Sequence, residues 1–357
     1  MIPQSEIPIF DADAYRLTDQ EAELSEVARA LGRDKFAERA ATYDREARFP
    51  TENYVDMKAA GLLAICVPKA YGGMGADYRA YSLAAAEIGR FCGATALTWN
   101  MHVCSSLWTG PLADTIDMST EERASHETRR SEHYRRIVED GAIYAQPFSE
   151  GGSAAAGSVP FATRAVREEN GWRISGRKIF ASLSGNADYY GVLCTEDKDG
   201  KLSRRNTLYV AVAADAAGVS VSGEWDPLGM RGTVSRNLLL DDVEVPFAEA
   251  LMPAGVYYQA ARRWPHMFLT LTPTYVGIAQ AAYDFTVAYL RGEVPGQKGD
   301  KRRDNANKQH NVAEMNLMLE QTKALWFQSV SDARVDPPKA VVMRAYAAQY
   351  SVMETAN

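Results

Sequence analysis

Four blocks between residues 143 and 246 decide the fold of this protein. Residues 144–153 read YAQPFSEGGS and residues 171–182 read GWRISGRKIFAS. Residues 228–233 read LGMRGT and residues 241–246 read DDVEVP. The runs between them are short, rich in β-branched and aromatic residues, and bounded by Gly, Asn or Asp. The spacing of these turn signals favours an antiparallel sheet or barrel over parallel β-α-β units.

Helical patterns flank this stretch on both sides. On the N-terminal side, Leu24, Val27 and Leu31 recur at helical spacing, and Ser119 with Glu122 forms a capping-box pattern. On the C-terminal side, one set of residues follows the alternating three- and four-residue spacing of a bundle helix: Val312, Met315, Leu319, Thr322 and Trp326.

These patterns predict an α+β protein with three domains. We expect a helical N-terminal domain at residues 1–142, a central antiparallel β-barrel or sheet domain at 143–252, and a C-terminal helical bundle at 253–357. No G-x-G-x-x-G motif opens a helix, so a Rossmann dinucleotide site is not expected.

The overall composition excludes several classes of protein. The net charge of −7 provides no basic excess for binding nucleic acid. The four cysteines form no C-x-x-C pair, so neither a metal site nor a disulfide framework is expected. The N-terminus lacks the pattern of a signal peptide, and no apolar run is long enough to span a membrane. We therefore expect a cytoplasmic protein.

The four blocks, in this order and at roughly this spacing, resemble the central β-domain of the acyl-CoA dehydrogenase family. Residues 68–75, PKAYGGMG, resemble the PxxYGGxG loop of the family's N-terminal domain and form an independent second match. Residues 339–357 read as a helix that is still continuing, whereas the family normally adds a Gly-Gly turn and a last helix. The resemblance therefore implies a C-terminal domain that is incomplete.

The first block is the candidate cofactor loop. Its Gly and Ala residues let the backbone approach a ligand closely, and its N–H groups can form an anion-binding concavity. The resemblance implies that this loop wraps FAD, with Tyr144, Gln146, Phe148 and Gly152 at the cofactor. It also places Ser153 near the pyrophosphate or the acyl-pantetheine chain of the substrate.

This loop departs from the family pattern at two places. Residues 148–150 replace the usual acidic-Pro-Gly core, and Ala154 follows where the family has Asp. A Gly/Ala-rich turn taken alone is more often an ordinary loop than a ligand site. Its combination with the second block makes the cofactor interpretation the stronger one.

The second block carries Phe180 and Ser182. An aromatic ring at position 180 can pack on the flavin, and a hydroxyl at position 182 can bond the reactive end of the flavin. The family more often has Trp and Thr at these two positions. The alternative interpretation is an ordinary strand with one buried Phe. The third block resembles the family's LGxRxxxxR segment, with Arg236 as the second arginine, and this segment more plausibly shapes a domain junction.

The sequence supplies no catalytic base that can be named. Oxidation of an acyl thioester requires a carboxylate to remove the α-proton and donors to hold the charge on the thioester oxygen. In most members of the family this Glu lies in the C-terminal segment that is missing here. A minority place it at the position of Met267, beside an arginine that corresponds to Phe268. His266 is a possible substitute, but a lone His is more often structural.

The C-terminal helices contain one further candidate residue. The resemblance matches Gln309 with a glutamine that contacts the flavin of a neighbouring subunit. The family's Arg-x-x-Phe-Gly motif is not legible in residues 290–296, and loss of its arginine would weaken the contact with FAD across the dimer. The resemblance also implies a homodimer or a homotetramer.

The leading hypothesis is FAD-dependent α,β-dehydrogenation of an acyl-CoA in fatty acid or lipid metabolism, with electrons passed to an electron-transfer flavoprotein. One alternative keeps the fold and changes the chemistry to that of a flavin-dependent monooxygenase, which needs no carboxylate base. Another alternative is a non-catalytic subunit that pairs with an active homologue. The sequence does not fix the length or type of the acyl chain.

Overall fold

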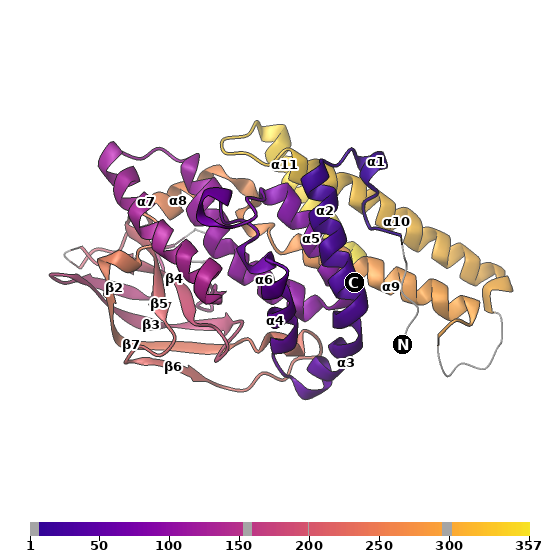
Figure 1. Ribbon diagram of the computed structural model, residues 1–357, viewed down its shortest axis with the longest axis horizontal. Helices are drawn as coiled ribbons and strands as arrows, with labels where there is room; N and C mark the ends of the chain where they lie inside the picture. Colours follow the sequence, from indigo (N-terminus) through magenta and orange to yellow (C-terminus); the bar gives the residue numbers. More distant parts are fainter. Residues whose placement is uncertain (1–6, 153–158, 199, 295–301) are drawn as a thin grey trace. The chain divides into compact units, whose positions relative to one another are not determined.

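The computed structural model describes residues 7–152, 159–198, 200–294 and 302–357 (Figure 1). Ser153 therefore lies outside the described residues. The chain divides into two compact units. Unit 1 consists of Met1–Thr42, Tyr78–Leu97 and Phe268–Asn357, and unit 2 consists of Tyr43–Asp77 and Thr98–Met267. The domain boundaries expected at residues 142 and 252 remain predictions.

Unit 1 is helical. Its helices are α1 (Ala12–Tyr15), α2 (Asp19–Leu31), α5 (Tyr78–Phe91), α9 (Thr272–Arg291), α10 (Ala306–Ser331) and α11 (Lys339–Ala356). Two more helices, α3 (Ala37–Glu46) and α6 (Gly93–Leu107), contain residues of both units. Two glycines bring α5 and α9 together, because a Cβ on Gly277 would lie 2.2 Å from the oxygen of Ala86, and one on Gly89 would lie 2.7 Å from that of Thr274.

Among the described residues, unit 2 contains three α-helices of its own, and one of them begins at a cap that the sequence encodes. They are α4 (Thr51–Ala59), α7 (Thr120–Arg135) and α8 (Val256–Arg263). At the start of α7, Glu122 N–H donates to the Ser119 hydroxyl at 3.1 Å and Ser119 N–H donates to the Glu122 carboxylate at 2.9 Å. This geometry confirms the predicted capping box. Helix α7 is less solvated than its charged sequence suggests, because His126, His133 and Tyr134 on it are buried.

All seven strands of the described residues belong to unit 2. They are β1 (Tyr144–Ala145), β2 (Arg164–Arg167), β3 (Gly171–Ala181), β4 (Tyr189–Glu196), β5 (Thr207–Ala213), β6 (Val219–Ser222) and β7 (Arg236–Pro246). The sheet order is β1-β4-β2-β3-β7-β6, with β5 on β4. Figure 1 shows this sheet in pink and orange.

The predicted fold class, helices followed by a sheet and then helices, is confirmed. The sheet is mixed rather than purely antiparallel. Strands β1 and β2 both run parallel to β4, in short pairs such as Tyr144 with Tyr189, while the longer β3–β7 and β4–β5 pairs are antiparallel. Strands this short carry no periodicity from which a direction can be read. No helix among the described residues is long and apolar enough to cross a membrane.

Candidate functional site

The candidate site centres on a bulge near the end of β3. Lys178 pairs with Leu238 of β7, and Ala181 pairs with Arg236, so β3 contains one residue more than β7 over this interval. Phe180 lies within the bulge at a φ of 52°. Ser182 N–H then donates to the Phe180 oxygen at 2.9 Å and closes a tight turn. A positive φ is unfavourable for a residue with a bulky side chain, and such strain concentrates at functional sites.

The bulge presents the ring of Phe180 to solvent. The residue is 62% exposed, although it is a large apolar residue on a strand. Its one described aromatic neighbour is Trp225, in an edge-to-face arrangement with the ring centroids 6.1 Å apart. The indole N–H of Trp225 donates to the Met230 oxygen at 3.2 Å. The exposure rules out the interpretation of an ordinary strand with a buried Phe, and it leaves an aromatic surface on which a planar ligand can stack.

A chain of three hydroxyl groups lies directly beside the bulge. The hydroxyl oxygens of Ser182 and Ser235 are 2.7 Å apart, and those of Ser235 and Thr233 are also 2.7 Å apart. The Thr233 hydroxyl donates to the Met230 oxygen at 2.8 Å. All three residues are buried. The polar group expected at position 182 is therefore present, and it is held by two further residues.

An ion pair fixes the first block to β3. Lys178 is fully buried, and its ammonium lies 2.7 Å from a carboxylate oxygen of Glu150 and 2.5 Å from the Leu193 oxygen. The same carboxylate accepts the N–H groups of Ala162 and Thr163 at 2.6 and 3.0 Å. Glu150 therefore joins Lys178 of β3 to the backbone of Ala162 and Thr163.

The charges of this pair are mutually dependent. Burial favours the neutral form of Glu150, but the charge and hydrogen bond of Lys178, with the hydrogen bonds of Thr163, hold the pKa of that carboxyl below its usual value. Burial lowers the pKa of the Lys178 ammonium. Neither group is free to act as a proton carrier, so the pair serves to hold residue 150 against β3.

The remaining predicted residues of the first block are held within unit 2. The Tyr144 hydroxyl lies 3.0 Å from Nδ1 of His133. The Gln146 amide donates to the Gly191 oxygen at 3.0 Å and accepts the Tyr209 hydroxyl at 2.5 Å. Tyr144 and Gln146 are both buried, and their polar groups are occupied by protein.

Two further residues of that block differ in their packing. The ring of Phe148 stacks on that of Trp108, with the centroids 5.3 Å apart and an interplanar angle of 21°. Gly152 is exposed, and a Cβ at that position would meet no atom of the described residues within 4 Å. Phe148, in contrast, belongs to an aromatic cluster, and contact of either residue with a flavin stays a prediction.

Gln309 lies in unit 1, on α10. Its amide donates to the Arg303 oxygen at 2.8 Å. It lines a cavity of about 370 Å³ together with residues that include Tyr283, Arg291 and Arg303. Two guanidinium-bearing residues beside apolar side chains suit an anionic or aromatic ligand.

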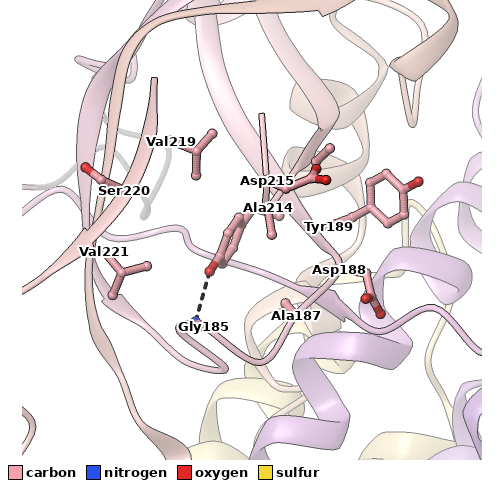
Figure 2. Close-up of a pocket in the computed structure, with 11 residues that line it drawn as sticks. Gly185, Ala187, Asp188, Tyr189, Ala214, Asp215, Val219, Ser220 and Val221 are labelled. Atoms are coloured by element: carbon pink, nitrogen blue, oxygen red, sulfur yellow. Dashed lines mark hydrogen bonds between the residues drawn. The ribbon is translucent and has the colours of Figure 1, made fainter. Parts of the chain in front are cut away.

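A second cavity, of about 550 Å³, lies in unit 2 where β4, the end of β5 and β6 come together (Figure 2). Asp188, Tyr189, Asp215 and Ser220 line it, and Gly185 N–H donates to the Tyr190 hydroxyl at 3.2 Å across one side. None of the described residues predicted to contact the flavin lines this cavity.

The positions considered for a base contain no carboxylate. Met267 and His266 are both buried, and the His266 ring lies at a tilt to that of Trp264 with the centroids 6.0 Å apart. A fully buried ring of this kind fits a structural role better than a catalytic one. The catalytic base remains unassigned.

Sequence reasoning missed the supporting residues of this site. Ser235, Thr233 and the pairing of Glu150 with Lys178 were not expected, although the residues themselves lie in or beside the quoted blocks. Thr233 ends a short helical turn and Ser235 lies just before β7, so no strand or helix periodicity in the sequence places their hydroxyl groups together. No local pattern indicates which partner a buried lysine takes.

Two segments of the chain match known protein families. Residues 18–114 match the acyl-CoA dehydrogenase N-terminal domain, and residues 149–243 match the acyl-CoA dehydrogenase middle domain. The probable acyl-CoA dehydrogenase YngJ of Bacillus subtilis is 28% identical over 282 residues, which cover 78% of this chain and 70% of the relative. The probable acyl-CoA dehydrogenase fadE25 of Mycobacterium leprae is 27% identical over 341 residues, 95% of this chain and 82% of the relative.

Solved structures of the same fold differ in chemistry. Butyryl-CoA dehydrogenase from Megasphaera elsdenii has a TM-score of 0.77 at 21% identity, over 95% of this chain and 85% of that one. KijD3 in complex with FMN and a dTDP-linked sugar has a TM-score of 0.77 at 23% identity, over 95% of this chain and 82% of that one. Dibenzothiophene monooxygenase TdsC from Paenibacillus sp. A11-2 has a TM-score of 0.75 at 20% identity, over 93% of this chain and 84% of that one. These likenesses establish the fold.

Proposed function

The chain belongs to the acyl-CoA dehydrogenase family, and we propose on this basis that it binds FAD at the β3 bulge and oxidises an acyl-CoA thioester between its α- and β-carbons. Electrons then pass to an electron-transfer flavoprotein. The observation that carries the proposal is the exposed ring of Phe180 at a strained φ of 52°, beside the Ser182 hydroxyl. A bulky residue held at an unfavourable backbone conformation supports a functional role for this bulge.

The residues of the site fit a flavin. The ring of Phe180 offers one face for offset stacking on a planar heterocycle. Ser182 offers a hydroxyl at its edge, and Gly152 offers open backbone. The Glu150–Lys178 pair holds residue 150, two positions before Gly152, against β3. When bound, FAD supplies the two-electron redox chemistry.

The proposal is tested by the visible absorption of the purified protein loaded with FAD under anaerobic conditions. Acyl-CoA thioesters of increasing chain length are added one at a time. We expect the flavin band to bleach with at least one of them, which also identifies the substrate class. A loaded protein whose band is unchanged by every thioester contradicts dehydrogenation.

A second candidate is a flavin-dependent monooxygenase of the same fold. It is favoured by the absence of a carboxylate at Met267 and by the likeness in fold to TdsC. The monooxygenase is distinguished from the dehydrogenase by an assay in which the protein receives reduced flavin and oxygen in place of a thioester. Oxygen uptake is then measured. A protein that takes up no flavin until a homologous subunit is added would support the third alternative, a non-catalytic subunit.

A further inference from the structure

The hydroxyl chain beside Phe180 has a fixed direction. A backbone oxygen can only accept a hydrogen bond, so the single proton of the Thr233 hydroxyl is used on the Met230 oxygen at 2.8 Å. Ser235 must then donate to Thr233 across their 2.7 Å contact. The proton of Ser235 is used in turn, so Ser182 must donate to Ser235, also at 2.7 Å.

This direction determines what Ser182 can offer a ligand. A hydroxyl has one proton and two lone pairs, and the proton of Ser182 is committed to Ser235. Its oxygen is therefore left as an acceptor. For Ser182 to donate to a ligand, either its hydrogen bond to Ser235 is given up, or the chain reverses and Thr233 loses its bond to Met230. A lost neutral hydrogen bond shifts an equilibrium by about threefold to tenfold.

We propose that Ser235 and Thr233 are positioning residues that hold Ser182 as an acceptor, so that the site favours reduced over oxidised flavin. The proposal rests on the proposed flavin site. Reduced flavin carries a proton on N5 that an acceptor can bind, whereas oxidised flavin has a lone pair there. An acceptor facing this edge therefore raises the midpoint potential of the bound flavin, because it stabilises only the reduced form.

The test is the midpoint potential of bound FAD, measured by dye-coupled reduction, with the dissociation constants of oxidised and reduced FAD. Ser182→Ala removes the acceptor, while Ser235→Ala and Thr233→Val release Ser182 to donate to the oxidised form. We expect all three variants to bind reduced FAD about threefold to tenfold less favourably relative to oxidised FAD. A tenfold change lowers the potential by about 30 mV for a two-electron couple.

Ser184→Ala is the matched control, because Ser184 is a buried hydroxyl two residues away that donates to the Ala181 oxygen. The midpoint potential of FAD bound to Ser184→Ala should equal that of FAD bound to the parent. A rise in potential in Ser182→Ala would overturn the proposal, since it would mean that Ser182 donates to oxidised flavin. Unchanged potentials in Ser235→Ala and Thr233→Val would also overturn it. A parent protein that binds neither form of FAD contradicts the proposed function itself.

Discussion

The two units of this protein bury ionisable groups of opposite kind. Unit 2 buries the imidazoles of His102, His126 and His133, and burial lowers the pKa of each to about 4. Unit 1 buries the carboxyl of Glu87, and burial raises its pKa to about 7. Both shifts have the same cause, since a low-dielectric interior disfavours the charged form. The two units should therefore respond to pH in opposite directions.

Local contacts explain why each group is kept neutral. His102 lies 2.8 Å from the Leu63 oxygen through Nε2 and accepts Tyr144 N–H through Nδ1 at 3.0 Å. This arrangement needs one protonated and one unprotonated nitrogen. Glu87 accepts Ile9 N–H at 2.7 Å with one oxygen, and its other oxygen has no hydrogen-bond partner among the described residues. Protonation would thus disrupt unit 2 and relieve unit 1.

The largest expected effect is the loss of stability of unit 2 in mild acid. A histidine whose folded pKa of about 4 lies below its unfolded value of 6.5 contributes stability that is present above pH 6.5 and is lost as the pH falls through 4. A tenfold change in proton affinity corresponds to about 1.4 kcal/mol, so the three histidines together contribute several kcal/mol to the free energy of unfolding.

Amide hydrogen exchange resolved by segment is the measurement for this prediction. Between pH 6.5 and pH 4, protection in α6, α7 and β4 should fall while that in α5 and α9 holds or increases. Equal losses in both sets of segments would contradict the contrast between the units.

The next largest effect concerns the buried ion pair of unit 2, between Lys178 and Glu150. Lys178→Met leaves Glu150 without its cation and should lower the free energy of unfolding by about 3–5 kcal/mol. Adding Glu150→Gln should restore most of that loss, because the carboxylate is then no longer buried without a counter-charge. Denaturant unfolding of the parent, the single and the double variant provides the comparison. A double variant as unstable as the single one would mean that the packing of Lys178, and not its charge, supplies the stability.

Glu87→Gln should remove the pH response of unit 1. A carboxyl whose folded pKa of about 7 exceeds its unfolded value of 4.5 contributes stability that is fully present below pH 4.5 and is lost as the pH rises through 7. The amide stays neutral and can still accept Ile9 N–H, so the variant should gain about 2–3 kcal/mol above pH 7. It should gain nothing near pH 4. Thermal unfolding at the two pH values measures the difference, and an equal gain at both would point to packing.

The smallest expected effect concerns the strained bulge of unit 2. Phe180→Gly relieves the positive φ of 52° and removes an exposed apolar ring, so the free energy of unfolding should rise by about 1 kcal/mol. The same change removes the stacking surface, and affinity for FAD should fall at least tenfold. Tyr15→Phe, in unit 1, serves as an aromatic control that leaves FAD affinity unchanged. If Phe180→Gly is less stable than the parent and binds FAD as tightly as the parent, the proposed relation between backbone strain and flavin binding is wrong.

The sequence indicated the fold well because its signals are local. The capping box at Ser119 and the turn-bounded strands depend on neighbours within a few residues, and both occur as expected. Parallel pairing of β1 and β2 with β4 depends on residues about 30 to 50 positions apart, and no periodicity encodes it. The exposure of Phe180 depends on an extra residue relative to β7, which only the register of the two strands reveals.

The candidate site was indicated in part for the same reason. The resemblance points to positions 180 and 182, and their residue types suggest stacking and hydrogen bonding, but their contact with a flavin stays a prediction. The direction of the hydroxyl chain was out of reach, because it depends on Thr233 meeting the Met230 oxygen in a short helical turn. The role of Glu150 was likewise hidden, because its partner Lys178 lies on another element.

Fluorescence titration of FAD with the purified protein, carried out side by side for the parent and Phe180→Ala, tests the central claim most directly. Stacking on an aromatic ring quenches flavin fluorescence, so the parent should show saturable quenching. Phe180→Ala should bind at least tenfold more weakly while its unfolding transition remains that of the parent. A parent that does not bind FAD, or a variant that binds it equally well, would contradict the assignment of the β3 bulge as the flavin site.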